Sequence, residues 1–232
     1  MKRAFLFILL FFGLGGGAFA QQAGAPNLFD AMQSVYAGMQ AMRCEFEQTL
    51  VHRESGGKTT RPGTLEFKKP LLARWELAGA SPELIVVSDS EVWNYLPDEE
   101  VAYRYSAAVL DRDNSFLKIV TGQANLRQDF EIASEAQADD GSVEYHLYPF
   151  RPTQQLTELY LWIDSGQGSR GEAGVIRRVR IIDFFGNEND IRFTQCDLKA
   201  RPDAAAFQFT PPAGVDVEDN RNNPRPELNL FQ

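Results

Sequence analysis

The chain has 232 residues, with 23 Lys or Arg against 32 Asp or Glu, and its formal net charge is −9. An acidic chain repels nucleic acid and anionic lipid surfaces, and no basic patch with interleaved aromatic residues offsets this repulsion, so we expect no nucleic-acid partner. The length suffices for one sizeable hydrophobic core, and we expect a monomer with one main domain.

The first twenty residues have the pattern of a secretory signal peptide. Lys2 and Arg3 precede an apolar run, residues 4–14, that is too short to span a bilayer, and Ala18-Phe19-Ala20 matches an A-x-A cleavage site. We therefore expect residues 1–20 to be removed and residues 21–218 to form the exported domain. Without Lys2 and Arg3 the net charge becomes 21 − 32, or −11.

A helix is predicted from about Leu28 to Met42, because apolar residues recur there at helical spacing and Asn27 is a favourable N-cap. We expect its apolar stripe to pack on a sheet. Residues 44–51 then alternate between apolar and polar side chains, which predicts the first strand.

Residues 63–105 read as an antiparallel meander, with short strands separated by turn residues such as Pro70, Gly79 and Pro82. Apolar and polar side chains alternate along these strands, so one face of the sheet is expected to be apolar and rich in aromatic residues. The residues predicted to line this face are Leu65, Phe67, Ala73, Trp75, Leu77, Trp93 and Tyr95.

Residues 107–129 lose the two-residue period and contain two short helical segments separated by Gly122. Segments of this length are not stable alone. We therefore expect them to form a hinged lid over the apolar face. Its predicted apolar contacts are Phe116, Leu117, Ile119 and Val120.

The second half returns to strands, with turn signals at hairpin spacing and no crossover helices. The expected fold is mainly β with an α lid: an incompletely closed antiparallel barrel of about ten to eleven strands covered by short helices. Residues 219–232 are rich in Pro, Asn and charge, and we expect a disordered tail there.

Cys44 and Cys196 would meet an oxidising compartment, where a disulfide can form. Strand alternation argues against the bridge, because Cys44 shares a face with Phe46, whereas Cys196 lies on the face opposite to Phe193. A β-bulge would reverse this argument, so the pairing stays open.

No catalytic motif, metal site or cofactor site is predicted. The two histidines, His52 and His146, are too few for a zinc site, and no Walker A, GxSxG, HExxH or CxxC pattern is present. An apolar barrel interior is either filled by side chains or left open for a ligand, and the bulky aromatic residues favour a ligand cavity. Lys69 and Arg74 flank the apolar strand and are candidates for contact with a ligand head group or with the lid.

Several motifs together resemble the periplasmic outer-membrane lipoprotein carrier family, LolA. They are Phe46-Glu47-Gln48, Gly63 to Pro70, Arg74-Trp75, Val87-Ser88-Asp89 with Trp93-Asn94-Tyr95, the turn at Asp183 and Gly186-Asn187, and Phe207 to Val217. The resemblance implies a periplasmic carrier with a hydrophobic cavity for the acyl chains of lipoproteins. It also implies two partners, an inner-membrane ABC lipoprotein-releasing complex and an outer-membrane acceptor.

By resemblance, Trp75 matches a cavity-lining tryptophan, and Phe116, Leu117 and Ile119 match apolar lid residues. Lys69 stands where many carriers have an arginine, which puts the family's tie between lid and barrel in question. Two alternatives remain: an envelope lipid- or lipoprotein-sensing regulatory module of the same fold, and a secreted hydrolase that uses His146 with a nearby carboxylate.

Overall fold

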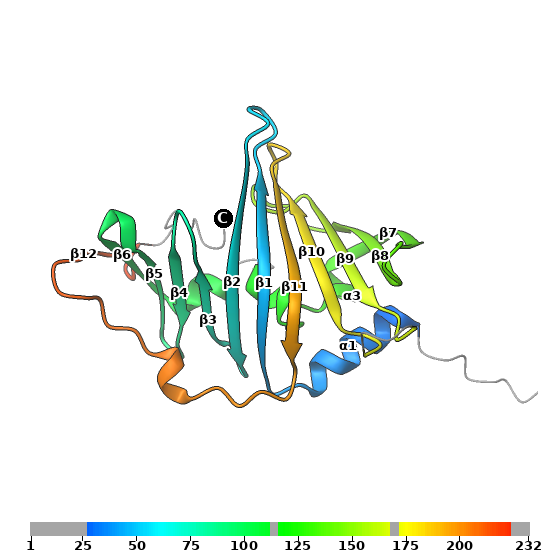
Figure 1. Ribbon diagram of the computed structural model, residues 1–232, viewed down its shortest axis with the longest axis horizontal. Coiled ribbons are helices and arrows are strands. Elements are labelled where there is room, and N and C mark those ends of the chain that lie inside the picture. The colour runs from blue at the N-terminus through cyan, green and yellow to red at the C-terminus, as the bar shows by residue number, and fades with distance from the viewer. Residues whose placement is uncertain (1–26, 112–115, 168–171, 224–232) are drawn as a thin grey trace, which may run out of the picture.

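The computed structural model describes residues 27–111, 116–167 and 172–223, and within them twelve strands form one sheet (Figure 1). The strands are β1 (Ala41–Val51), β2 (Lys58–Lys68), β3 (Leu72–Leu77), β4 (Glu83–Val87), β5 (Glu91–Leu96), β6 (Val101–Ser106), β7 (Phe130–Gln137), β8 (Ser142–Pro149), β9 (Glu158–Asp164), β10 (Ile176–Ile182), β11 (Glu188–Asp197) and β12 (Asp216–Asp219). The α-helices are α1 (Leu28–Gly38), α2 (Phe116–Val120) and α3 (Leu126–Asp129). Short 3₁₀ helices are η1 (Pro97–Glu99), η2 (Ala107–Asp111) and η3 (Ala204–Phe207).

The strands follow the order β12-β6-β5-β4-β3-β2-β1-β11-β10-β9-β8-β7. All pairs are antiparallel except β12, which runs parallel to β6. The two edge strands, β12 and β7, are not paired with each other, so the predicted open barrel is confirmed. We predicted a disordered tail from residue 219 onward. Asp219 is instead the last residue of β12, and Asn220–Asn223 are also ordered. The rest of the tail lies outside the described residues.

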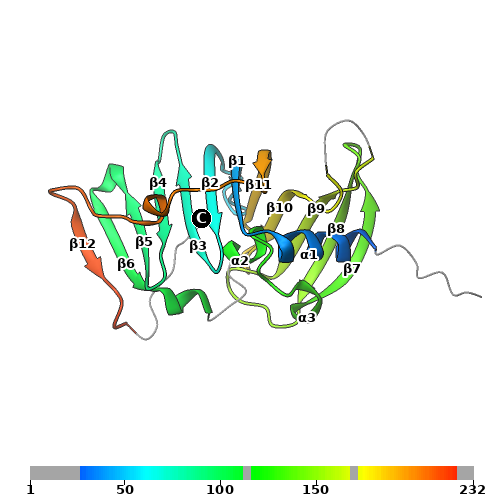
Figure 2. The same ribbon diagram turned by 90° about the horizontal axis from the view of Figure 1, so that it is seen from below.

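The sheet is strongly curved, and the α-helices lie on its concave side (Figure 2). Helix α1 begins as expected, with the Asn27 side chain accepting a hydrogen bond from the backbone N–H of Asp30 at 2.9 Å. It ends at Gly38, earlier than predicted, because Met39 is already extended and β1 begins at Ala41. Every helix in the described part of the chain is too short or too polar to span a bilayer.

The main hydrophobic core lies between the concave face and the helices. A second, smaller core lies on the convex face of β4, β5 and β6, where Val86, Trp93 and Ala102 pack beneath Phe209 and Val215. The segment after η3 therefore covers part of the outside of the sheet, and its path crosses β4 to β6 in Figure 2.

Cys44 and Cys196 form a disulfide that links β1 to β11, with 4.2 Å between their Cα atoms. The strand-alternation argument against this bridge was wrong. The register between the two strands shifts between Glu45 and Phe46, so that Phe46 faces Phe193 while Cys44 faces Cys196. The bulge adds one residue to β11 and brings the second cysteine onto the face of the first.

Candidate functional site

The concave face of β2 and β3 is the apolar surface predicted from residue alternation. Leu65 pairs with Trp75, and Phe67 pairs with Ala73, across the two strands. Five of the seven predicted cavity residues come together here and are at most 1% exposed: Leu65, Phe67, Ala73, Trp75 and Leu77. The ring of Phe46 lies 4.0 Å from that of Trp75, centroid to centroid, and extends the surface onto β1.

Helix α2 lies against the same core. Leu117, Ile119 and Val120 are fully buried and belong to the same hydrophobic cluster as the β2 and β3 residues. Phe116 is the first residue of α2, and its side chain lies outside the described part of the structure. The side chains of Leu117, Ile119 and Val120 thus fill the concave face of the sheet at this point.

Polar contacts join α1 to the segment that contains α2 and α3. Arg127 of α3 lies 2.7 Å from the carboxylate of Asp30 in α1, and the amide of Gln33 donates to the carbonyl of Ala124. Both ionic side chains are nearly half exposed, and such pairs contribute at most about 1 kcal/mol. Apolar burial, rather than this ion pair, therefore holds α2 and α3 against the sheet.

Lys69 ties the end of β2 to α1, which is not the predicted lid segment, whereas Arg74 pairs within its own strand. The ammonium group of Lys69 donates to the carbonyl of Ala37 at 2.6 Å, at the C-terminal end of α1 where helix carbonyls lack partners. Arg74 points to the convex face and pairs with Glu76 at 3.1 Å. The prediction that Arg74 contacts the lid or a ligand head group was therefore wrong.

Trp93 and Tyr95 were also assigned to the wrong face. Trp93 belongs to the convex core and Tyr95 packs against that core, where both rings contact Phe209. The residues of β5 that face inward are Val92 and Asn94. Strand β4 is apolar on both faces, so alternation along β5 could not show which of its faces meets the interior.

At its far end the concave face becomes polar. Arg61 of β2 donates to the Gln48 side chain at 2.8 Å and lies 3.8 Å from the carboxylate of Glu83, which also receives a hydrogen bond from Asn94. Arg61 and Glu83 are both buried, and with Tyr103 and Tyr105 they line a pocket of about 910 Å³. We did not predict this cluster. Strand alternation could have indicated it, because Gln48 lies two residues after the inward-facing Phe46, and Arg61 lies two residues before the inward-facing Gly63.

Residues 37–210 match the family described as "Outer membrane lipoprotein carrier protein LolA". The chain belongs to the LolA family. An outer-membrane lipoprotein carrier protein from Methylibium petroleiphilum is 28% identical over 200 residues, covering 85% of this chain and 92% of the relative. One from Dechloromonas aromatica is 24% identical over 189 residues, covering 81% and 86%.

A solved structure of an uncharacterized conserved protein from Thermus thermophilus has the same fold, with a TM-score of 0.51 and 14% identity over 83% of this chain and 96% of that chain. LolA-family carriers are binding and transport proteins rather than enzymes. Sequence reasoning therefore identified the correct family.

His146 does not provide this LolA-family chain with a recognisable catalytic centre. Its Nε2 lies 2.9 Å from Glu158, as a catalytic pair would require. However, the ring is on the convex face, stacked on Tyr160 with 4.1 Å between centroids and packed beside Tyr148. This is a cross-strand packing arrangement. Among the described residues, no group of three or more His, Cys, Asp or Glu side chains is suited to hold a metal ion.

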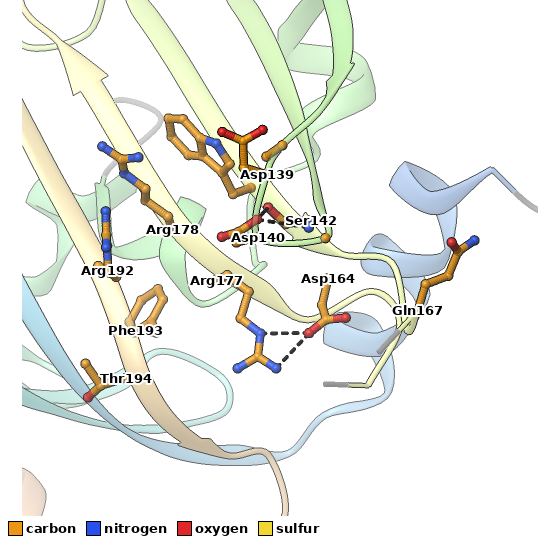
Figure 3. A pocket seen from close by; sticks show the side chains of 13 residues that line it. Asp139, Asp140, Ser142, Asp164, Gln167, Arg177, Arg178, Arg192, Phe193 and Thr194 are labelled. Carbon is orange, nitrogen blue, oxygen red and sulfur yellow. Dashed lines mark hydrogen bonds and ion pairs between the residues drawn. The ribbon is translucent and has the colours of Figure 1, made fainter. Parts of the chain in front are cut away.

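A second pocket, of about 820 Å³, lies on the convex face of β8 to β11 (Figure 3). Several of its polar groups are paired: Arg177 lies 2.7 Å from Asp164, Arg178 lies 2.5 Å from Asp190 beside the pocket, and the Ser142 hydroxyl donates to Asp140 at 2.6 Å. The hydrogen bonds from Ser142 lower the pKa of Asp140. These pairings indicate a structural network rather than a ligand site.

The Glu83 carboxyl predicts a pH dependence of stability. Burial raises its pKa from 4.5 to about 7, although Arg61 and Asn94 oppose the shift. A carboxyl with a raised pKa stabilises the fold fully below its unfolded pKa, and this contribution is lost as the pH rises through the folded value. As the pH rises from 4.5 to 7, the free energy of unfolding of wild-type protein should fall by on the order of 1–3 kcal/mol relative to that of Glu83→Gln.

Urea unfolding across this pH range would measure the difference. Glu76→Gln, which changes an exposed carboxylate on the convex face, is the matched control and should parallel wild type. Parallel stability curves for wild type and Glu83→Gln would contradict the assignment.

Gly122 predicts a specific steric effect at the lid. It follows α2 with φ +65°, and a Cβ there would lie 2.2 Å from Cβ of Tyr36 in α1. Gly122→Ala should therefore lower the free energy of unfolding by about 1–3 kcal/mol beyond the loss caused by backbone strain alone. It should also speed hydrogen exchange at the Ile176 amide, which donates to the Tyr36 hydroxyl at 3.1 Å.

Gly56→Ala is the matched control for this change, because Gly56 has φ +68° and no heavy atom within 4 Å of an added Cβ. Equal losses of stability for the two variants in urea unfolding would show that the contact between Gly122 and Tyr36 does not constrain the lid.

Proposed function

We propose that this protein is a periplasmic carrier that binds the acyl chains of lipoproteins on the concave face beneath the lid. The observation that carries the proposal is that Leu117, Ile119 and Val120 are fully buried in one core with Leu65, Phe67 and Trp75. A short lid covers an apolar surface that a different apolar group can cover equally well. The names of the LolA-family relatives support the same cargo, and the pattern of residues 1–20 supports export.

Exchange of one apolar cover for another explains how such a carrier releases its cargo. Each buried methylene is worth about 0.8 kcal/mol, so complete enclosure of several acyl chains would make dissociation extremely slow. If α2 leaves the core and lies over the entering chains, the contacts that its apolar side chains lose with the concave face offset most of the free energy gained by burying the chains. Net affinity then stays moderate, and a tighter acceptor can remove the cargo.

The proposed route begins at an inner-membrane ABC lipoprotein-releasing complex and ends at an outer-membrane lipoprotein acceptor. The chain carries no Walker A motif, so ATP hydrolysis would act at the releasing complex. Transfer to the acceptor requires only a gradient of affinity.

Extraction and delivery of a lipoprotein test this function. Native protein purified from periplasm should contain an acyl-modified peptide by mass spectrometry, and loaded protein should pass it to acceptor-bearing outer-membrane vesicles. Binding without delivery would favour the sensing module. An empty carrier that extracts nothing from membranes in the presence of the releasing complex would contradict the proposal.

A further inference from the structure

A polar pocket lies at the far end of the concave face, beyond the apolar surface proposed for the acyl chains. Its volume is about 910 Å³, and its lining comes from β2, β4, β5 and β6, from η1 and from the chain around β12. Clefts of about 300–1,000 Å³ enclose most of the surface of a small ligand. The pocket is therefore large enough for part of a peptide as well as for a single side chain.

The charge of this pocket is mainly negative. Among the described residues that line it, Arg61 is the only cation, and it already lies 3.8 Å from the carboxylate of Glu83. The other acidic residues of the lining are Asp98, Glu99 and Glu218, and none of the three forms an ion pair within the part of the chain that the structure describes. An additional positive charge in the pocket would therefore be stabilised.

Two tyrosine rings accompany these carboxylates. Tyr103 and Tyr105 of β6 have nearly parallel rings, with 18° between the planes and 6.5 Å between the centroids. Burial raises the pKa of the Tyr103 phenol, and the negative charges of Glu218 and Glu99 raise this pKa further. Both carboxylates thus act on the same part of the pocket. Aromatic rings also attract cations, so the rings and the carboxylates favour the same kind of ligand.

Asn94 of β5 supplies a buried acceptor to the same pocket. The residue is 5% exposed, and its amide donates a hydrogen bond to Glu83. Its Oδ1 atom has no hydrogen-bond partner among the described residues. A buried acceptor without a donor costs about 1–3 kcal/mol, and a ligand N–H group that reached Oδ1 would remove this cost. Lysine and arginine side chains present only donors and carry the positive charge that the carboxylates favour.

We propose that this pocket binds a lysine or arginine side chain of the polypeptide that carries the acyl chains. The identity of that polypeptide rests on the proposed function. Arg61 lies four positions before Leu65 on β2, which corresponds to about 13 Å along the strand. An extended peptide covers this distance in about four residues. The carrier therefore prefers cargo with a basic residue within about four positions of the acylated one.

A metal ion fits the pocket less well than an organic cation. Within residues 27–111, 116–167 and 172–223, no group of three or more His, Cys, Asp or Glu side chains is arranged to hold a metal ion. Carboxylates that are spread around a wide pocket suit a ligand with several separated donors, such as a basic side chain with its adjoining peptide bonds.

Two fluorescent diacylated peptides test this inference. They are identical except for one residue, lysine or norleucine, three positions after the acylated one. Wild-type protein should bind the lysine peptide roughly tenfold more tightly by fluorescence anisotropy, and added salt should lower this ratio. In Glu99→Gln/Glu218→Gln the ratio should fall to about twofold or less. Both carboxylates are exposed, so this variant should fold normally.

Glu45→Gln/Glu47→Gln is the matched control for the change of charge. It removes two exposed carboxylates from the convex face of β1, away from the pocket, and should keep the wild-type ratio. Loss of the lysine preference in this control to the same extent would show that overall charge, rather than the pocket, selects the peptide, and would overturn the inference.

The remaining outcomes separate the pocket from the proposed function. Equal affinity of wild type for the two peptides would overturn the pocket assignment and leave the proposed function standing. If neither acylated peptide bound, the proposed function would fail, and the unacylated lysine peptide would test the pocket alone. It should shift the NMR signal of the Asn94 side-chain amide, and absence of a shift would overturn the inference. An equal shift with spermidine at the same concentration would assign the pocket to a free polyamine instead.

Discussion

Ile119→Asp is expected to abolish recovery of bound lipoprotein. Ile119 is fully buried in the core beneath the lid, and an ionised carboxylate there costs several kcal/mol because no partner compensates it. Helix α2 has only five residues and ends beside Gly122, so moving α2 out of the core is cheaper than burying the charge. In the loaded state the same carboxylate would face acyl chains.

The measurement is the amount of acyl-modified peptide that co-purifies from periplasm, which should fall roughly tenfold or more. Two controls separate lid chemistry from general damage: Ile119→Val keeps an apolar side chain, and Lys118→Asp places the charge on the neighbouring residue, which is only half-buried. Near-ultraviolet circular dichroism should show that the sheet stays folded. Wild-type cargo recovery by Ile119→Asp would refute the role of α2 as lid.

Among the substitutions proposed for this protein, removal of the Cys44–Cys196 disulfide is expected to cause the largest loss of stability. The cysteines are 152 residues apart in sequence, and the bridge joins β1 to β11, where the two halves of the sheet meet. In the chain-entropy description a loop of this length corresponds to about 5 kcal/mol, and measured disulfides more often contribute about 2–4 kcal/mol. Cys44→Ala/Cys196→Ala should therefore lose about 2–5 kcal/mol.

Urea unfolding of the double variant gives this value, and wild type unfolded in the presence of dithiothreitol should coincide with it. Because the variant keeps the hydrogen-bonded pairing of β1 with β11, it should retain native circular dichroism in the absence of urea. A loss below about 1 kcal/mol would show that strand pairing alone holds the two halves together.

Alternation along single strands explains why much of the apolar site was predictable. Leu65 and Phe67, like Trp75 and Leu77, are separated by polar residues, and one buried face is the physical cause of that pattern. The packing of α2 on the sheet was predictable for a related reason: helices as short as α2 exist only against an apolar surface. Family motifs then identified the class of protein.

The incorrect assignments arose where local pattern depends on distant partners. Trp93 and Tyr95 alternate correctly, but Phe209 and Val215 cover the convex face and create a second buried surface there. The bulge in β11 reverses the face of Cys196. Neither the covering of the convex face nor the bulge can be recognised from the local sequence around the residues that it affects.

The sequence by itself therefore determined an acidic, mainly β chain with one apolar sheet surface and a short helical cover, because composition and periodicity record which side chains avoid water. Only the tertiary structure decided which aromatic residues share the interior, how Lys69 meets the end of α1, and that Arg61 and Glu83 form a buried pair. These features depend on contacts between residues distant in sequence, and burial becomes specific only when the strands pair in one register.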